Sequence, residues 1–509
     1  MNQVTSSVPN RAAPFGGLLR RAWARPAAVA FGLTLLLFGS YLSVSHYKEL
    51  YYDANGYWDL ATQYWGTGQF RFLSYDNLLR GYLFPLLLAP LTRLAEHFAL
   101  EPIVLTRAVG ALTAAALFGV VVPGLWRAVR APGAGPVPLG RRLLLALLGF
   151  VCWRGYFNFP LTDFPALLAL TAGLWAVLRG RGLSSALGSG LLAGVLVAAA
   201  ANFRPIYAAT LLVAALLCVW PLRHGWRQGP REAWGPRLAA FAVGVALVLA
   251  PQARLNQFHV GVASPLVLTT RPGTPSLYLQ QLHWGLQMQR YETNVGRDYP
   301  EPAMRFLDAK GQALLARAGL TDSLPLASYG QYGQLMRRAP LTVAGVWLGH
   351  LFNGLDLHYP TPYIPAVYVP TWPLAWLNYT VLLGGLLVLG GRARRLWRGG
   401  WPAAGPAAAA LLVAAALLGS CLPVLPVAIE CRFLLPLHLL LSAAFVFGLR
   451  PQALWRRWRA ASLARRLALG GLYVVLMLAC FRLALKTQFT LQHGARDLTG
   501  TPTYPLGVW

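Results

Sequence analysis

Apolar segments long enough to cross a lipid bilayer recur along this chain from residue 27 to residue 485. A transmembrane α-helix needs about 20 consecutive, mainly apolar residues. Of the 509 residues, 56% are hydrophobic and only 12% are charged. Inside a bilayer every backbone N–H and C=O must find a partner within the protein, so such segments become helices or a closed barrel. Their lengths match helices, and the sequence predicts an all-α, polytopic membrane protein.

The basic residues predict the orientation of these segments. The formal net charge is +28, but Lys and Arg lie in short clusters between apolar segments instead of on one soluble face, which argues against a nucleic-acid partner. Short cytoplasmic loops are enriched in Lys and Arg. Six such clusters occur, at 11–25, 127–142, 179–181, 223–237, 392–398 and 450–466. With all six in the cytoplasm, the amino terminus is cytoplasmic and the carboxyl terminus lies outside.

This orientation leaves eleven predicted spans. They lie near residues 27–45, 103–126, 143–159, 163–178, 184–202, 205–222, 238–254, 373–390, 404–422, 433–449 and 467–485. Two further apolar stretches, 81–95 and 340–353, are short and interrupted by Arg93 and His350, so we interpret them as interfacial or re-entrant helices. The expected count is therefore eleven to thirteen. Glu232 is then the only cytoplasmic acidic residue among the sixteen in the chain.

The predicted spans divide the chain into parts. These are a basic cytoplasmic tail at 1–26, a first membrane core at 27–255 that contains a first outer loop at 46–102, an outer loop or cap at 256–340, a second membrane core at 341–485, and an outer tail at 486–509. Within the cap, residues 301–320 have the apolar periodicity of an amphipathic helix. Residues 356–372 contain four prolines, which exclude regular helix and favour an extended, ordered loop.

No motif in the outer segments indicates a cofactor. The five cysteines lie within or at the ends of predicted spans, and the outer histidines are scattered along the chain. Neither a Cys-x-x-Cys nor a His-Glu-x-x-His pattern occurs in these segments, so the spacing of a metal site is missing. We therefore expect no cofactor, and a divalent metal ion stays an open alternative that no motif indicates.

Carboxylates at the outer ends of spans are the first candidates for chemistry. Asp53 follows the first span, in an aromatic-rich run that would anchor a short helix at the water–lipid boundary. Asp163 begins the fourth span just ahead of Pro165, and it could instead act only as a helix cap. Asp59 lies six positions after Asp53. On a continuous helix the two would not share a face, so we interpret Asp59 as structural support.

Arginines at the otherwise apolar outer rim are the second group of candidates. Arg204 falls between the fifth and sixth predicted spans, Arg432 begins the tenth, and Arg80 lies in the first outer loop. An outer Arg runs against the positive-inside bias, and a guanidinium can grip a phosphate through two parallel hydrogen bonds. The alternatives are that Arg432 simply pairs with the nearby Glu430, or that these side chains reach out to lipid phosphates.

The order of these motifs resembles that of the GT-C glycosyltransferases. The motifs are Asp53 after the first span, Arg80-Gly81-Tyr82 before an apolar helix, Thr162-Asp163-Phe164-Pro165, Phe203-Arg204-Pro205, Ala253-Arg254-Leu255-Asn256, and Glu430-Cys431-Arg432-Phe433 followed by Pro436. The resemblance runs to about residue 450. Within the superfamily it is strongest to the branch that holds protein O-mannosyltransferases and the aminoarabinose transferases of lipid A. Many members carry an Asp-Glu pair in the first loop, whereas here Ala54 follows Asp53.

The resemblance implies a transferase that acts at the outer face of a bacterial plasma membrane, surrounded by membrane lipids. Its donor would be a sugar linked through phosphate to a polyprenyl chain, and its acceptor a lipid, a glycan or a protein. Such a reaction needs a carboxylate to take the acceptor proton and cations to hold the leaving phosphate. The roles implied here are a base for Asp53, orientation of the acceptor or base for Asp163, phosphate binding for Arg204, Arg432 and Arg80, and support for Asp59 and Glu430.

Three other functions fit parts of this pattern. A flippase or transporter of lipid-linked sugars would place ionisable groups near the bilayer midplane, whereas the predicted span interiors are nearly free of charge. An oligosaccharide ligase or polymerase would share the chemistry at the rim. A noncatalytic scaffold that binds lipid-linked sugars would tolerate the loss of Asp53, and a turnover assay separates it from an enzyme.

Overall fold

The computed structural model describes residues 25–130, 135–179, 183–219, 234–270, 275–321, 324–398 and 406–493. Most of these residues are helical, and eight helices are long and apolar enough to cross a membrane. The prediction of a mostly helical, multi-pass membrane protein is therefore confirmed. Nearly all of the predicted basic tail, the last sixteen residues of the outer tail and Glu232 lie outside the described residues.

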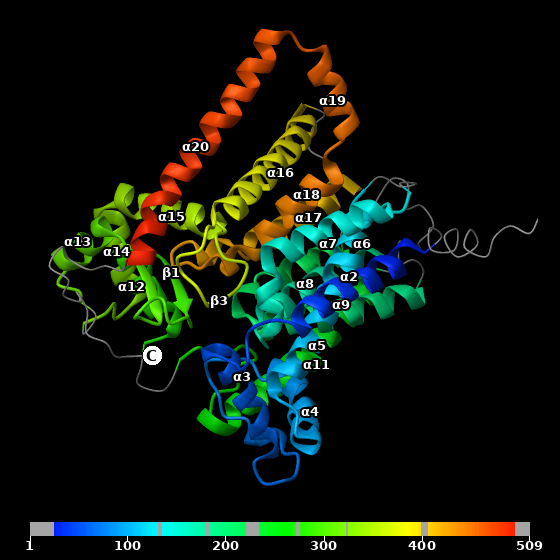
Figure 1. The fold of residues 1–509 in the computed structure, drawn as a ribbon. Helices are drawn as coiled ribbons and strands as arrows, with labels where there is room; N and C mark the ends of the chain where they lie inside the picture. The colour runs from blue at the N-terminus through cyan, green and yellow to red at the C-terminus, as the bar shows by residue number, and fades with distance from the viewer. Residues whose placement is uncertain are drawn as a thin grey trace, which may run out of the picture.

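The predicted spans all coincide with helices, which form the bundle in Figure 1. The eight long ones are α2 (Pro26–Ser43), α5 (Pro102–Ala114) with a π-helical turn and α6 (Val122–Ala128), α9 (Leu183–Phe203), α11 (Trp234–Val260), α16 (Trp372–Arg398), α17 (Pro406–Gly419) with a short turn, α18 (Leu435–Gly448) with the turn before it, and α20 (Leu463–His493). Three helices are shorter, namely α7 (Leu139–Trp153), α8 (Asp163–Arg179) and α10 (Thr210–Val219). With 17 residues, α8 is at the lower limit for a full span, whereas α7 has only 15.

Small residues let the longest helices approach closely. A Cβ atom added at Gly194 of α9 would lie 2.1 Å from the carbonyl oxygen of Phe241 in α11, and one at Gly244 of α11 would lie 2.3 Å from that of Leu191. Backbone contacts of this kind are typical of membrane helices, where lipid gives little hydrophobic drive for association. The α9–α11 pair therefore fixes the end of α9, after which Arg204 follows.

The small sheet and the helices that are not among the predicted spans gather at one end of the bundle, which we call the sheet end (Figure 1). They are α3 (Tyr52–Thr62), α4 (Leu83–Phe98), α12 (Leu277–Gln287), β1 (Met288–Asn294), β2 (Ala303–Leu307), α13 (Ala309–Arg317), α14 (Tyr329–Arg338), α15 (Pro340–Leu355) and β3 (Tyr363–Ile364). The sheet order is β2-β1-β3, with β1 antiparallel to β2 and parallel to β3. The opposite end, where α8 finishes at Arg179, we call the basic end; α19 (Pro451–Ala460) joins α18 to α20 there.

The sheet is small, and it corrects one expectation. Residues 301–320 do not form one helix, because Ala303–Leu307 pairs with β1 as a strand. The helix α13 starts only after Asp308, whose carboxylate caps it by accepting a hydrogen bond from the N–H of Gly311 at 2.6 Å. Apolar spacing alone could not reveal the strand, because its pairing partner β1 lies in another segment. The two predicted interfacial stretches are the helices α4 and α15.

Candidate active site

Six of the seven charged residues predicted from the sequence meet at the sheet end of the bundle. We call them the rim cluster, and they are Asp53, Arg80, Asp163, Arg204, Glu430 and Arg432. They come from the starts of α3 and α8, the loop before α4, the end of α9 and the turn before α18. The seventh, Asp59, is exposed and accepts a hydrogen bond from the side chain of Asn55 at 2.9 Å. Three carboxylates and three guanidinium groups make the rim cluster neutral overall.

Arg432 stands at the centre of the rim cluster and contacts all three carboxylates. Its Nε and Nη2 atoms lie 2.7 and 2.9 Å from the two oxygens of Glu430. Its Nη2 also lies 3.5 Å from Oδ2 of Asp53, and its Nη1 lies 3.6 Å from Oδ2 of Asp163. The two longer distances exceed those of good hydrogen bonds, so Arg432 is held firmly by Glu430 and only loosely by the aspartates.

Each aspartate has a second arginine of its own. Nη2 of Arg80 donates to Oδ1 of Asp53 at 2.6 Å, and Nη1 of Arg204 donates to Oδ1 of Asp163. Asp163 is the first residue of α8, so the positive end of the helix dipole also favours its charge. The pairing with Arg204 shows that the Asp163 carboxylate does more than cap its helix.

The rim cluster is buried at one side and open at the other. The Asp163 and Glu430 side chains are only 3% and 2% exposed, whereas those of Arg80 and Asp53 are 27% and 44% exposed. Burial acts to raise the pKa of the Asp53 carboxyl, but Arg432 and Arg80 outweigh it and hold that pKa below its usual range. Asp53 is therefore an ionised carboxylate at the accessible edge of the network.

Local backbone geometry sets the direction of Asp53. The preceding residue, Tyr52, has a φ of +39°, which non-glycine residues rarely adopt and which costs on the order of 1–3 kcal/mol when enforced. The N–H of Ala54 donates to the hydroxyl of Tyr363 at 3.2 Å. The start of α3 is thus tied to β3, which lies more than three hundred residues further along the chain, and the tie holds Asp53 toward the arginines.

The Arg80-Gly81-Tyr82 motif is explained by how its loop docks on α9. A Cβ atom at Gly81 would lie 2.0 Å from the carbonyl oxygen of Asn202, so only glycine fits there. The side chain of Asn202 in turn accepts a hydrogen bond from the N–H of Leu83 at 3.0 Å. With the loop fixed, the Arg80 guanidinium lies 4.3 Å from the centre of the Tyr57 ring, a cation–π contact.

Aromatic residues that the sequence analysis did not assign to the site complete its walls. The Phe433 ring lies under both Arg204 and Arg432, at 5.3 and 5.7 Å from the guanidinium carbons. Tyr291 in β1 makes a side-chain hydrogen bond to Glu430, and burial raises the pKa of that glutamate above its usual range even with Arg432 beside it. Phe433 directly follows Arg432, so the sequence could have indicated it as a site residue. Tyr291 lies far from the other site residues along the chain, and no sequence pattern connects it to them.

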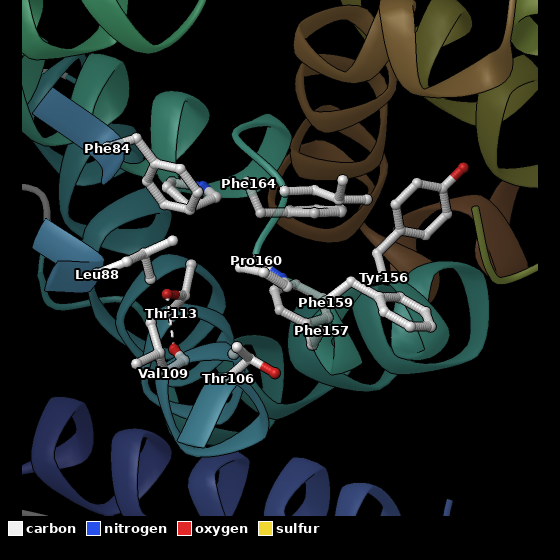
Figure 2. Close-up of a pocket in the computed structure, with 13 residues that line it drawn as sticks. Phe84, Leu88, Thr106, Val109, Thr113, Tyr156, Phe157, Phe159, Pro160 and Phe164 are labelled. Carbon is white, nitrogen blue, oxygen red and sulfur yellow. Dashed lines mark hydrogen bonds between the residues drawn. The ribbon is translucent and has the colours of Figure 1, made fainter. Parts of the chain in front are cut away.

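A small apolar pocket lies beside the rim cluster (Figure 2). Leu161 and Phe164, on either side of Asp163, line it together with Phe84, whose ring lies 5.4 Å from that of Tyr57. The hydroxyl of Thr113, also in its wall, is satisfied by the carbonyl oxygen of Val109 at 2.8 Å, as Figure 2 shows. The pocket therefore suits an apolar group next to a charged one.

A second charged network lies deeper at the sheet end, and the sequence analysis did not predict it. We call it the sheet cluster, and it comprises Arg290, Glu292, Asp356, His358 and Tyr379. Arg290 contacts Glu292 at 2.6 Å and Asp356 at 3.1 Å, and Nε2 of His358 lies 2.9 Å from Asp356. All five residues are at most 5% exposed.

In the part of the chain that the structure describes, no three His, Cys, Asp or Glu side chains are grouped so that they could hold a metal ion. In comparisons with known proteins, no family model matches the chain, and a search of curated proteins found no match either. The chemical interpretation of the rim cluster therefore depends on its own geometry.

Proposed function

We propose that this protein is a membrane glycosyltransferase that transfers a sugar from a polyprenyl-phosphate donor to a lipid, glycan or protein acceptor. The observation that carries the proposal is the rim cluster itself. Six charged residues from distant segments converge on one partly open site, next to an apolar pocket. A donor made of a phosphate and an apolar chain has the same two parts. The resemblance of the motifs to the GT-C glycosyltransferases supports the same conclusion.

The arginines supply the phosphate-binding part. Arg432 keeps two stretched contacts, to Asp53 and Asp163, and these are the contacts that an incoming phosphate would replace most easily. Arg80 is partly exposed beside them. Charge-assisted, bidentate hydrogen bonds to phosphate are strong, and they strengthen further as negative charge develops on the leaving polyprenyl phosphate. The cluster would thus stabilise the leaving group.

Asp53 is the group placed to take the acceptor proton. In the free protein Arg80 and Arg432 hold its pKa low, which makes it a weak base. A donor phosphate that draws these guanidinium groups to itself would remove that stabilisation and raise the pKa of Asp53 toward the range useful for general base catalysis. Donor binding would in this way activate the base. Asp163, buried and paired with Arg204, would act as a positioning residue.

The distribution of charge supports an outward-facing site. The helix α8 begins at Asp163 and ends at Arg179, so the rim cluster and the arginine-rich loops occupy opposite ends of the bundle. The positive-inside rule places the basic end in the cytoplasm. The rim cluster would then open to the outer leaflet of a bacterial plasma membrane, where a flipped lipid-linked sugar presents its headgroup.

The test is release of polyprenyl phosphate by the purified, reconstituted protein from a panel of polyprenyl-phosphate sugars. Asp53→Asn should lower turnover by about 10²- to 10⁴-fold, the usual contribution of a general base. Asp59→Asn is the matched control on the same helix, and it should retain nearly full turnover. Donor binding without turnover in the wild type would point to a flippase or a scaffold, and full activity of Asp53→Asn would remove Asp53 from the reaction.

A further inference from the structure

Four arginines converge at the basic end of the bundle, and we call them the basic-end cluster. They are Arg130 after α6, Arg392 and Arg395 near the end of α16, and Arg450 between α18 and α19. Arg130, Arg395 and Arg450 lie close enough to Arg392 to repel it electrostatically. Among the described residues none of the four forms an ion pair with a carboxylate. Such a concentration of like charge favours an anionic ligand.

The depth of the basic-end cluster matches that of lipid headgroups. The helix α16 begins with Trp372, an aromatic residue of the kind that marks a membrane–water interface. Arg392 follows twenty residues later, and at about 1.5 Å per residue that is about 30 Å along the helix. The hydrocarbon core of a bilayer is about 30 Å thick. Arg392 therefore lies where the phosphates of the opposite leaflet are found.

A tryptophan fixes the position of Arg392. The guanidinium carbon lies 4.5 Å from the centre of the Trp126 ring, and that ring lies 5.5 Å from Phe447 of α18. Trp126 is only 7% exposed, and its indole N–H makes no hydrogen bond within the described ranges. A buried N–H without an acceptor is costly. A phosphate oxygen that entered between Arg392 and the edge of the indole would supply the acceptor.

The elements next to the basic-end cluster have the features of segments that lie at a membrane surface. Arg141 donates to the carbonyl oxygens of Phe447 and Leu449, at 2.6 and 3.0 Å, and so fixes the end of α18 just before Arg450. The following helix, α19, has no buried residue and exposes Trp455 and Trp458. Tryptophan and arginine on one short amphipathic helix are typical of a segment that lies in the headgroup region.

We infer that the basic-end cluster binds the phosphate of an anionic phospholipid. The ligand chemistry is a phosphate, which a soluble anion also offers, but the depth of Arg392 and the exposed tryptophans of α19 favour a lipid headgroup. The site lies at the opposite end of the bundle from the rim cluster and does not rest on the proposed function. Basic pockets between membrane helices on the cytoplasmic side bind such headgroups in other proteins.

The test measures the affinity of the full-length protein for phosphatidylglycerol by native mass spectrometry in detergent, with phosphatidylcholine as the neutral reference. The double variant Arg392→Gln with Arg450→Gln should bind phosphatidylglycerol about 25-fold more weakly, because each basic residue near the surface contributes about a factor of five. Arg337→Gln with Arg338→Gln removes the same charge from exposed positions of α14 at the sheet end and should bind nearly as tightly as the wild type. Arg130→Gln changes an exposed side chain, should fold normally and should bind about fivefold more weakly.

Three results would overturn the inference. The first is equal affinity of the wild type and the Arg392, Arg450 double variant. The second is an equal loss in the Arg337, Arg338 control, because binding would then follow net charge and not the cluster. The third is displacement of the lipid by millimolar inorganic phosphate, which would make the ligand a soluble anion. If Asp53→Asn did not alter turnover, the proposed function would be contradicted but the lipid-binding inference would not be affected. The two proposals can therefore fail separately.

Discussion

The rim cluster and the sheet cluster are both networks of arginine and carboxylate side chains at the same end of the molecule, yet they differ in how fully they are closed. In the sheet cluster Arg290 and Asp356 are 0% and 1% exposed, and Arg290 also donates to the backbone oxygen of Asp356 at 2.8 Å. In the rim cluster, Asp53 is nearly half exposed and Arg432 contacts two carboxylates only at 3.5 and 3.6 Å. The sheet cluster is thus closed to a ligand by burial, whereas the rim cluster is partly exposed and holds two of its contacts loosely.

This difference separates a structural network from a binding site. Buried ion pairs gain little net stability, but removing one partner is costly because a charge is left unpaired in a low dielectric. Arg290 joins β1 to the segment after α15 and thereby fixes the position of the sheet. The sheet in turn supplies Tyr291, which makes a side-chain hydrogen bond to Glu430, and Tyr363, which accepts a hydrogen bond from the N–H of Ala54 beside Asp53. The sheet cluster therefore holds the rim cluster in place.

The comparison between the sheet cluster and the rim cluster predicts its largest effect on the free energy of unfolding. Arg290→Gln leaves Glu292 and Asp356 without their cation, and we expect a loss of about 3–5 kcal/mol in the free energy of unfolding. Arg80→Gln is the matched change in the rim cluster, and we expect a loss below about 1 kcal/mol because that pair is partly exposed. Thermal unfolding in detergent measures both. Wild-type stability in Arg290→Gln would mean that the sheet cluster is not structural.

An intermediate effect is expected on donor affinity. Arg432→Lys keeps a positive charge for Glu430 but loses the planar fork that matches phosphate. We expect about a tenfold weaker binding of a short-chain polyprenyl-phosphate sugar, measured by calorimetry, with little change in stability. Arg93→Gln is the control, because Arg93 pairs with Glu96 on α4 at 2.6 Å, away from the rim cluster. If both variants bound the donor as the wild type does, the open network would not be the phosphate site.

The smallest effect concerns acidification. Burial acts to raise the pKa of Asp356, but His358, Arg290 and Tyr379 outweigh it and hold it below the ordinary value. Its folded-state pKa is thus below its unfolded one, so its stabilising contribution is present above about pH 4 and is lost as the pH falls through the folded value. Asp356→Asn should flatten the decline in melting temperature on acidification, and Asp53→Asn should flatten it less, because the Asp53 carboxylate is nearly half exposed. An identical acid profile in wild type and Asp356→Asn would contradict this.

All six members of the rim cluster were candidates from the sequence, and two of its arginines stood out because they break a local rule. Arg204 and Arg432 are charged residues at the apolar end of a span opposite the basic loops, and such exceptions stand out. The sheet cluster broke no such rule. Arg290 and Glu292 are two residues apart in a polar loop segment, and only pairing in β1 puts them on one side of a strand. The six-residue spacing already predicted that Asp59 would not share a helix face with Asp53, and in α3 its side chain is exposed.

The sequence by itself determined that this chain is a helical membrane protein and which apolar stretches become helices, because the bilayer requires each spanning segment to satisfy its own backbone. It also marked the residues that carry charge at the helix ends. Only the tertiary structure decided which of those charges share a site, which became buried and which stayed open. Partners such as Asp53 and Arg432 lie far apart along the chain, and the packing of helices and the small sheet, not any local pattern, sets the distances between them.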